Sequence, residues 1–391
     1  MRISNNFDLG RLMTFELSKE IPIHNWFWYK EGYAPAIVDY AIADSQVPNP
    51  NVILDPFCGV GTTLLAAKSK AISSIGIDAS PLATFISRTK TTDYSSEHLA
   101  GLSHFLAKLG NLGVDEALLA KVDWPFELFD SRAAFPKRNY NEILSLRVAI
   151  DLEEDDSVRD LLMLALLSII PQASIILKDG GVLKIDKGKS AMPAKEIFRR
   201  KVKNMIKDLE QNSISGVVGH SPQVFVGDAR ALDIIAETVD LVVTSPPYLN
   251  NIDYSKIYGL ELSLLSMSKA EAEQVRMRAV RSFIGKKMKV DGMPPEVGEI
   301  GFKIPIIGTY FRDMEQAMYE MHRVLRHGGV AYIVVSNSVI HQTHVLVDEV
   351  LAEIAERIGF TDCEIVVGAE RIADVKPQKV KTRESVVKLR K

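Results

Sequence analysis

The sequence is poor in cysteine, with only Cys58 and Cys363 among its 391 residues. Two cysteines in unrelated contexts exclude a disulfide framework and a cysteine-rich zinc site, and they suit a reducing cytoplasm. The N-terminal segment lacks the basic-then-apolar pattern of a secretory signal. The most apolar stretch, Leu161–Leu177, contains Pro171 and is shorter than the roughly 20 residues of a membrane span. We therefore expect this stretch to form a buried core helix of a cytoplasmic protein without membrane contact.

The chain also has no excess of positive charge, since its net charge is −3. This charge balance excludes a protein that coats nucleic acid with a uniformly positive surface, but it allows a local basic cleft. The composition, with 47% hydrophobic and 25% charged residues, is that of an ordinary globular protein with a large core. The length suggests two or three domains.

Strand–loop–helix units recur along the chain and predict an α/β fold with a largely parallel sheet. A helix is expected over about 35–44, and strands are expected just before Asp55, over 73–77, over 223–226 and up to Thr244. A helix over about 310–325 should end at Gly328-Gly329 and lead into a strand and a C-terminal hairpin. Residues 92–220 show helical periodicity without a convincing strand series. They predict a mainly helical insertion between the second and third strands, which divides the chain into 1–91, 92–220 and 221–391.

A glycine-rich loop, Asp55-Pro56-Phe57-Cys58-Gly59-Val60-Gly61-Thr62-Thr63, follows the first of these strands. Glycines at this point let the backbone turn tightly and approach a ligand, and the next helix begins with free N–H groups. Thr62 or Thr63 is a candidate cap for that helix. Alone, the loop is weak evidence for a ligand site, because many α/β proteins use such a β–α turn for structural reasons.

Acidic residues end three of the expected strands. Asp78 follows Gly61 by seventeen positions, and Asp228 lies in Gly227-Asp228-Ala229 after the strand at 223–226. Ligands of open α/β sheets bind at the carboxyl ends of the strands. Asp55, Asp78 and Asp228 are therefore expected to face one polyhydroxylated, amine-bearing ligand, although a lone Asp after a strand is usually a helix cap.

The most specific motif is Thr244-Ser245-Pro246-Pro247-Tyr248, which follows an apolar strand and so lies at the same edge. An exocyclic amine of a nucleobase is a poor nucleophile, because its lone pair is delocalised into the ring. Ser245 Oγ and the Pro246 carbonyl are candidate acceptors for its N–H groups. Pro246 and Pro247 stiffen the turn, and Tyr248 is suited to stack on an extruded base.

These motifs resemble those of the DNA amino-methyltransferases, a branch of the Rossmann-like class I methyltransferases. The resemblance implies S-adenosylmethionine as cofactor, with Asp55 and the Gly59–Gly61 loop at its methionine part, Asp78 at the ribose and Asp228 at the adenine amino group. Phe57, Thr62 and Ala229 belong to the same motifs. It also implies direct methyl transfer at Ser245, Pro246, Pro247 and Tyr248 to a flipped base in double-stranded DNA. Residues 24–42 resemble the preceding helix motif of the family more loosely.

Several readings remain open. Ser245 resembles the cytosine-N4 subgroup, whereas adenine-N6 enzymes more often have Asp or Asn at that position. An RNA guanine-N2 methyltransferase has a similar glycine loop, and a catalytically silent scaffold would keep the fold. Cytosine-C5 methylation is disfavoured, because it needs a thiolate nucleophile and neither Cys58 nor Cys363 has a suitable setting. A restriction or defence partner is implied by the resemblance alone. The sequence does not indicate the oligomeric state.

Two basic segments are candidates for phosphate contact. Lys178–Lys207 has ten basic residues against three acidic ones, and Arg276–Lys289 has six basic residues and no acid. Either segment alone slightly favours a solvated helix face, but beside a base-modifying motif we favour contact with DNA phosphates. The target-recognition region is then expected in 92–220, in the basic segment 270–305, or in both. The candidates are Lys184, Lys187, Arg199, Arg200, Arg276, Arg278, Arg281, Lys286 and Lys287.

Aromatic residues and histidines carry weaker signals. Trp26, Trp28 and Tyr29 are expected to pack the N-terminal segment rather than border a site. His341 and His344 have helix-compatible spacing, but no further ligand accompanies them, so we expect no metal site.

Overall fold

The computed structural model describes residues 1–111, 131–179, 182–211, 221–250, 252–266, 268–282, 292–375 and 378–391. Its centre is an eight-stranded sheet in the order β1–β11–β12–β8–β7–β2–β3–β6. From β8 to β6 all neighbouring strands are parallel, whereas β12 is antiparallel to both β8 and β11. The strands of this sheet are β1 (Arg2–Asn5), β2 (Val52–Asp55), β3 (Ser73–Asp78), β6 (Gln223–Val226), β7 (Val239–Thr244), β8 (Leu325–Ser336), β11 (Asp362–Val375) and β12 (Gln378–Arg390).

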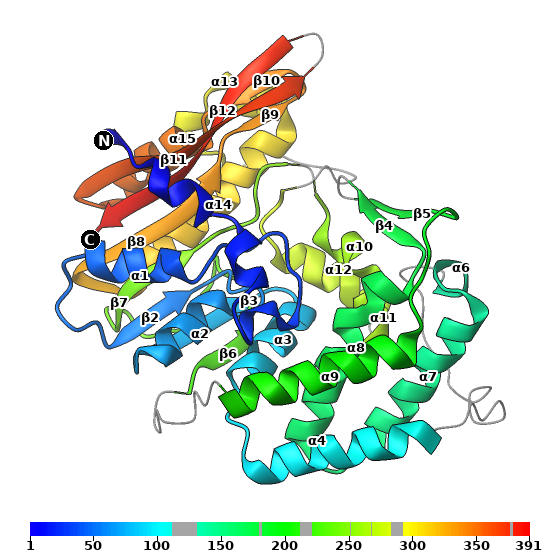
Figure 1. Ribbon diagram of the computed structural model, residues 1–391. Helices are drawn as coiled ribbons and strands as arrows, with labels where there is room; N and C mark the ends of the chain where they lie inside the picture. Colours follow the sequence, from blue (N-terminus) through cyan, green and yellow to red (C-terminus); the bar gives the residue numbers. More distant parts are fainter. Residues whose placement is uncertain are drawn as a thin grey trace.

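Helices cover both faces of this sheet (Figure 1). The central strand β7 is buried along its whole length, so both of its faces need apolar cover. Leu241 and Val243 pack with residues of α1 and α2, and Val242 packs with residues of α14 and α15. The helices of these two layers are α1 (Ala36–Asp44), α2 (Thr62–Ser69), α3 (Pro81–Thr91), α14 (Pro305–Val324) and α15 (Val347–Ile358).

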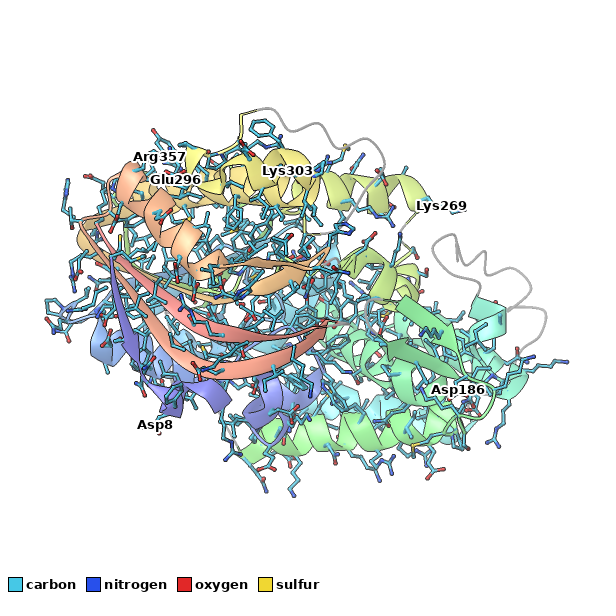
Figure 2. The ribbon with its side chains drawn as sticks, turned by 90° about the horizontal axis from the view of Figure 1, so that it is seen from above. Asp8, Asp186, Lys269, Glu296, Lys303 and Arg357 are labelled. Atoms are coloured by element: carbon cyan, nitrogen blue, oxygen red, sulfur yellow. The ribbon has the colours of Figure 1, made fainter. Side chains whose placement is uncertain are left out.

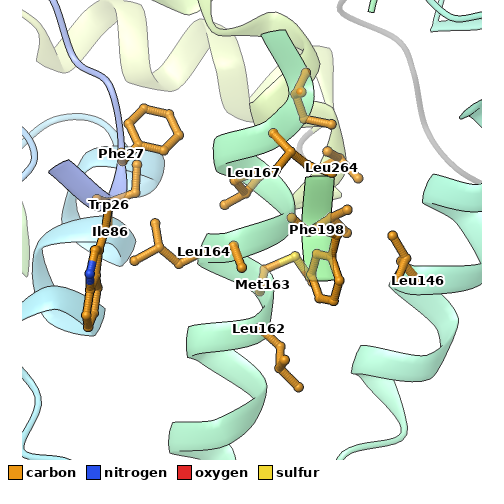
Figure 3. Packing of buried hydrophobic residues seen from close by; sticks show 14 of the residues in the cluster. Trp26, Phe27, Ile86, Leu146, Leu162, Met163, Leu164, Leu167, Phe198 and Leu264 are labelled. Atoms are coloured by element: carbon orange, nitrogen blue, oxygen red, sulfur yellow. The ribbon is translucent and has the colours of Figure 1, made fainter. Parts of the chain in front are cut away.

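Between β3 and β6 the chain forms a mainly helical unit with its own core. The 18-residue helix α8 is buried on most sides, and Figure 3 shows Leu162, Met163, Leu164 and Leu167 directed at different neighbours, Phe198 among them. The predicted buried core helix is confirmed as far as Ala173, but Ile176 and Leu177 belong to β4 and Leu177 is exposed. None of the helices in the described ranges is both long and apolar enough to cross a membrane. The elements here are α4 (Ser96–Lys108), η4 (Leu109–Asn111), α6 (Ser131–Ala134), α7 (Lys137–Asp151), α8 (Asp156–Ala173), β4 (Ile176–Asp179), β5 (Val182–Ile185) and α9 (Ala194–Gln211).

Short elements complete the fold and join its two halves. Before β2, η1 packs against β11 and η3 against α8. After β7, α10 and α11 contact β5 and α8 of the insertion, whereas η6 and α13 pack against α14. They are η1 (Phe7–Arg11), η2 (Phe15–Lys19), η3 (His24–Trp26), α10 (Tyr254–Ile257), α11 (Gly259–Leu264), α12 (Lys269–Arg278), η6 (Pro295–Val297), α13 (Glu299–Lys303), β9 (Ser338–Ile340) and β10 (Thr343–Val345).

The α/β class, the C-terminal hairpin and the helices near 35–44 and 62–69 are as predicted, but several details of the sequence interpretation are wrong. β1 was not expected, and it makes β3 the third strand of the chain, so the insertion follows the third strand. The insertion also contains the β4–β5 hairpin. α14 ends at Val324, and Gly328-Gly329 lies inside β8 at a register irregularity beside β7. Gly329 is needed there because a Cβ would come within 3.0 Å of the Asp240 carbonyl oxygen. His341 and His344 lie in the β9–β10 hairpin, not on a helix.

Candidate active site

The glycine loop after β2 depends on backbone conformations that favour glycine. Gly59 has φ +49° and Gly61 has φ +83°, both in the left-handed region. A Cβ on Gly61 would overlap the hydroxyl of Ser87 on α3. The predicted threonine cap is wrong, because Gly61 itself occupies the N-cap position of α2 without any side-chain cap.

Asp55 is the buried centre of a hydrogen-bond network rather than an open ligand contact. Its carboxylate accepts from Thr63 Oγ1 at 2.7 Å, from Thr244 Oγ1 at 2.6 Å and from the hydroxyl of Tyr33 at 3.2 Å. Burial raises the pKa of Asp55, and these donors partly offset that effect. The network joins β2, β7 and the N-terminal segment, so Asp55 holds the glycine loop against the strand that precedes Ser245. Tyr33 was not among the predicted site residues, although it lies within the loosely matching segment 24–42, between the aromatic cluster and α1.

Asp78 supports the same loop from the end of β3. Its carboxylate accepts from the backbone N–H of Gly59 at 2.9 Å and from that of Ser80 at 2.8 Å. Burial raises the pKa of Asp78 to about 6. Each oxygen keeps a further lone pair, so the carboxylate can also accept from a ligand hydroxyl.

Asp228 behaves differently from the other two acids. Arg230 binds its carboxylate through two nitrogens, with distances of 2.9 and 2.7 Å, and also approaches Asp313 at 3.1 Å. Gly227 and Ala229 line the cavity described below, but the Asp228 side chain does not. The sequence could place Asp228 at the sheet edge, but it could not show that Arg230 holds the carboxylate.

The Ser245–Tyr248 turn follows β7 directly. Ser245 Oγ donates to the carbonyl of Val334 on the neighbouring strand β8 at 3.2 Å. The hydroxyl of Tyr248 donates to Glu384 Oε1 at 3.2 Å, and burial raises the pKa of Tyr248 well above its ordinary value. Glu384 is on β12 and was not anticipated from the sequence.

The glycine loop and the Ser245–Tyr248 turn open into one cavity of about 890 Å³. Pockets for small ligands and cofactors usually fall between about 300 and 1,000 Å³. The predicted residues that line it are Asp55, Phe57, Gly59, Thr62, Asp78, Ala229, Ser245, Pro246, Pro247 and Tyr248. Gly61 does not line it, since its contribution is the turn itself.

An aromatic wall that the sequence did not reveal closes another side of the cavity. The ring of Tyr29 stacks on that of Tyr258, with 5.2 Å between centroids and 18° between planes. Lys178 Nζ lies 3.9 Å from the centre of the Tyr258 ring, and the Tyr258 hydroxyl donates to Glu31 at 2.7 Å. Burial raises the pKa of Glu31. These residues come from the N-terminal segment, the insertion and the junction of α10 with α11, so no single stretch of sequence could signal the wall.

The aromatic residues at 26–29 have two different environments. Trp26 is buried and donates from Nε1 to Asp208 at 2.9 Å, as expected for a packing residue. Trp28 is 58% exposed and, with Tyr29, lines the cavity, so the expectation that the cluster would only pack is wrong for these two residues.

The structure brings the two basic segments together only in part, since Lys178 and Lys189 of the first segment line the cavity. Arg276 and Arg278 of α12 line the cavity, and Arg276 forms ion pairs with Asp253 and Glu273. Lys184, Lys187, Arg199 and Arg200 are exposed on the insertion and do not line it. Figure 2 shows Asp186, next to Lys187, well apart from Lys269 at the start of α12.

Three further candidates belong to the second segment. The backbone N–H of Arg281 donates to Asp313 at 3.1 Å. Lys286 and Lys287 lie outside the described residues.

Both cysteines are buried, and burial raises the pKa of Cys58 well above its ordinary value, which disfavours a thiolate. Within the described ranges, no group of three His, Cys, Asp or Glu side chains has a geometry that could hold a metal ion.

The fold and the cavity define the class of protein. A glycine loop at positive φ, carboxylates at the ends of β2 and β3 and an adjoining turn with acceptor groups, on a Rossmann-like α/β sheet, are those of an S-adenosylmethionine-dependent methyltransferase. The residues present fit this cofactor. Gly59 leaves the loop without side-chain obstruction, and Asp78 offers acceptors for hydroxyl groups.

Comparison with known proteins supports this class. No family model matches the chain. It is similar to the type II methyltransferase M.BsoBI of Geobacillus stearothermophilus, with 25% identity over 91% of this chain and 82% of that protein. It is equally similar to M.AvaI of Anabaena variabilis, with 25% identity over 91% and 83%. Its curated homologues are thus type II methyltransferases, and both the resemblance and the cofactor inferred from the motifs are confirmed. A solved SAM-dependent methyltransferase from Methanosarcina mazei aligns with 90% of this chain and 97% of its own, at 10% identity and a TM-score of 0.31.

Proposed function

We propose that the protein is a DNA methyltransferase that transfers a methyl group from S-adenosylmethionine to the exocyclic N4 of cytosine. The observation that carries the proposal is the Ser245–Tyr248 turn, which opens into the same cavity as the glycine loop after β2. The sequence relatives support DNA as the substrate, since type II methyltransferases modify DNA in restriction–modification systems. A restriction endonuclease of the same specificity is the partner that this assignment implies.

The chemistry requires a more nucleophilic amino group. Acceptors on its N–H groups favour a pyramidal nitrogen with a localised lone pair. Ser245 Oγ directs its own proton to the carbonyl of Val334, which leaves its lone pairs free to accept. The Pro246 carbonyl is the second acceptor, and Pro247 keeps the turn stiff. Bound at this site, S-adenosylmethionine would supply an electrophilic methyl group on its sulfonium. Its sulfur would leave as a neutral thioether and the amino nitrogen would release one of its protons to water, so no enzyme nucleophile would be needed.

The cofactor residues divide by role. Asp55 holds the loop through its buried network, while Phe57, Gly59 and Thr62 face the cavity. Asp78 accepts from the ribose hydroxyls. We place the adenine beside Gly227 and Ala229, where the carboxylate of Asp228 reaches its amino group only if Arg230 releases it.

The target base must leave the duplex to reach Ser245, because the acceptors lie inside a cavity and not on a convex surface. Tyr248 and the Tyr29–Tyr258 wall offer aromatic faces to such a base. Arg276 and Arg278, at the cavity, are placed to contact phosphates beside the flipped nucleotide. Arg281 and the exposed cations of the insertion, Lys184, Lys187, Arg199 and Arg200, are proposed to extend that contact.

The test is to incubate the protein with labelled S-adenosylmethionine and unmethylated DNA, digest the DNA, and identify the labelled nucleoside by mass spectrometry. N4-methylcytosine is the expected product, and N6-methyladenine would keep the mechanism but change the base. Label in RNA but not in DNA would overturn the proposal, and cofactor binding without transfer to either would favour a silent scaffold.

Ser245→Ala should lose the activity. Ser336→Ala, at the end of β8 and outside the cavity lining, should keep it.

A further inference from the structure

The C-terminal hairpin extends beyond the central sheet. β11 and β12 stay paired as far as Val375 and Gln378, but β8 pairs with β12 only as far as Glu384. Among the described residues, 370–375 and 378–383 therefore pair as strands only with each other. We call this two-stranded extension the projecting ribbon, and Figure 1 shows it at the top of the view. At about 3.3 Å for each residue of a strand, it is about 20 Å long.

Ion pairs fix the base of the projecting ribbon beside the cavity. Arg383 donates to Asp348 at 2.7 Å and to Glu349 at 2.6 Å, both on α15. On the opposite face of the ribbon, Arg371 donates to Glu384 at 2.8 Å. Arg371 and Glu384 also line the cavity. The ribbon therefore begins at the wall of the candidate active site and leaves the sheet in a direction that these contacts hold.

The side chains of the projecting ribbon are cationic and, at one exposed position, apolar. Residues 370–383 include five basic residues and two acidic ones, in a chain whose net charge is −3. Ile372 is 71% exposed, and Lys381 stands opposite it with a side chain that is 68% exposed. Lys379 is also exposed. Lysines on an unpaired strand discourage pairing with other strands. That role alone does not account for an exposed isoleucine among them.

Duplex DNA matches both the shape and the chemistry of this ribbon. The major groove, about 12 Å wide and about 8.5 Å deep, admits a two-stranded β-ribbon. Lysines contact the phosphates along a groove, and an apolar side chain contacts the methyl group of thymine at its floor. The target base, which enters the cavity, also brings the duplex to the place where the ribbon begins.

We propose that the projecting ribbon enters the major groove beside the target base, with Ile372 at the base edges and Lys379 and Lys381 at phosphates. The inference rests on the proposed function, since it takes DNA as the substrate. It adds a third element to the surface that recognises the target, after the insertion and the basic segment at 270–305.

The first test is photo-cross-linking from the ribbon. Ile372→Cys is labelled with a photoactivatable maleimide, which should react selectively because Cys58 and Cys363 are buried. The labelled protein should cross-link to duplex DNA. Methyl green, which occupies the major groove, should suppress the cross-link, and netropsin, which occupies the minor groove, should not. Ile235→Cys is the matched control, since Ile235 is 78% exposed and lies outside the cavity lining, and it should give no cross-link.

The second test is the salt dependence of DNA binding. Neutralising two phosphate contacts in the double variant Lys379→Gln with Lys381→Gln should weaken binding about tenfold and lower the slope of log Kd against log salt concentration by about 2. Binding of S-adenosylmethionine should not change. Lys70→Gln is the control, because Lys70 is an exposed lysine that pairs with Asp39 at 2.7 Å, as Lys381 pairs with Glu370. It should leave the slope unchanged.

The outcomes separate this inference from the proposed function. Methylation of DNA by the wild-type protein, with no cross-link from position 372 or an equal one from position 235, would overturn the inference alone. Suppression by netropsin and not by methyl green, or an unchanged salt slope, would also overturn it. A cross-link from position 372 to a second copy of the chain, and none to DNA, would make the ribbon a protein contact instead. Methylation of RNA alone would overturn both proposals.

Discussion

Replacing Gly61 by alanine should destabilise the glycine loop, and two separate effects contribute to the loss in the free energy of unfolding. The first is backbone strain, because Gly61 has φ +83° and an L-residue in the left-handed region costs roughly 1–2 kcal/mol. The second is steric. The new Cβ would overlap the Ser87 hydroxyl and lie 3.2 Å from Ser87 Cα, and overpacking of this kind typically costs about 1–3 kcal/mol.

Gly328 provides a matched control. Its φ is +79°, yet a Cβ there would meet nothing within 4 Å. Gly328→Ala should therefore show the strain alone, about 1–2 kcal/mol, while Gly61→Ala should cost about 2–5 kcal/mol. Unfolding in urea measures both. In Gly61→Ala, displacement of the loop should also weaken S-adenosylmethionine binding, measured by calorimetry, whereas Gly328→Ala should bind normally.

Ser87 tests the steric part directly. Ser87→Ala removes the overlapping hydroxyl, so the double variant with Gly61→Ala should recover part of the lost stability, up to the limit set by the strain that remains. Equal destabilisation by Gly61→Ala and Gly328→Ala would refute the reasoning, because it would leave no cost for the contact with α3.

Three other perturbations follow from the site. Because the pKa of Asp78 is about 6, its carboxylate ionises as pH rises through that value. The cofactor should therefore bind about tenfold more tightly at about pH 7 than at about pH 5. Asp78→Asn should abolish this pH dependence in calorimetric titrations. Thr244→Val removes a buried donor to Asp55 and should lower the free energy of unfolding by about 1–3 kcal/mol in urea; an unchanged midpoint would argue against the network. Cys58→Ala should keep methyl transfer within a few-fold, since a buried thiol with a raised pKa takes no part in the chemistry; loss of transfer with normal folding would reopen a covalent mechanism.

The sequence located the catalytic edge because its signals are local. The strand before Asp55, the glycine loop and the turn after Thr244 each depend on a few consecutive residues, and the parallel sheet brings them together. β1 escaped prediction because four residues carry no clear period, and it is defined by pairing with β11. Gly328-Gly329 was misread as a helix stop because a glycine pair serves equally at a bulge.

The rest of the cavity depends on long-range packing. Glu31, Tyr258 and Lys178 are in contact only because the N-terminal segment, the junction of α10 with α11 and the insertion meet there. Asp228 illustrates the converse, since its position was foreseen but its partner Arg230 was not. Residue type and position along the chain say what a side chain can do, whereas its neighbours decide which of those roles is open.

The insertion between β3 and β6 has a consequence for how the chain folds during its synthesis. β2 and β3 emerge from the ribosome early, but their other neighbours, β7 and β6, are made only after the whole insertion. Until then the nascent sheet is a pair of parallel strands with unpaired edges, a state prone to aggregation. The helical unit, whose contacts are largely local, is able to collapse first. We therefore expect ribosome-bound chains that end before β7 to contain an ordered insertion attached to an unfinished sheet.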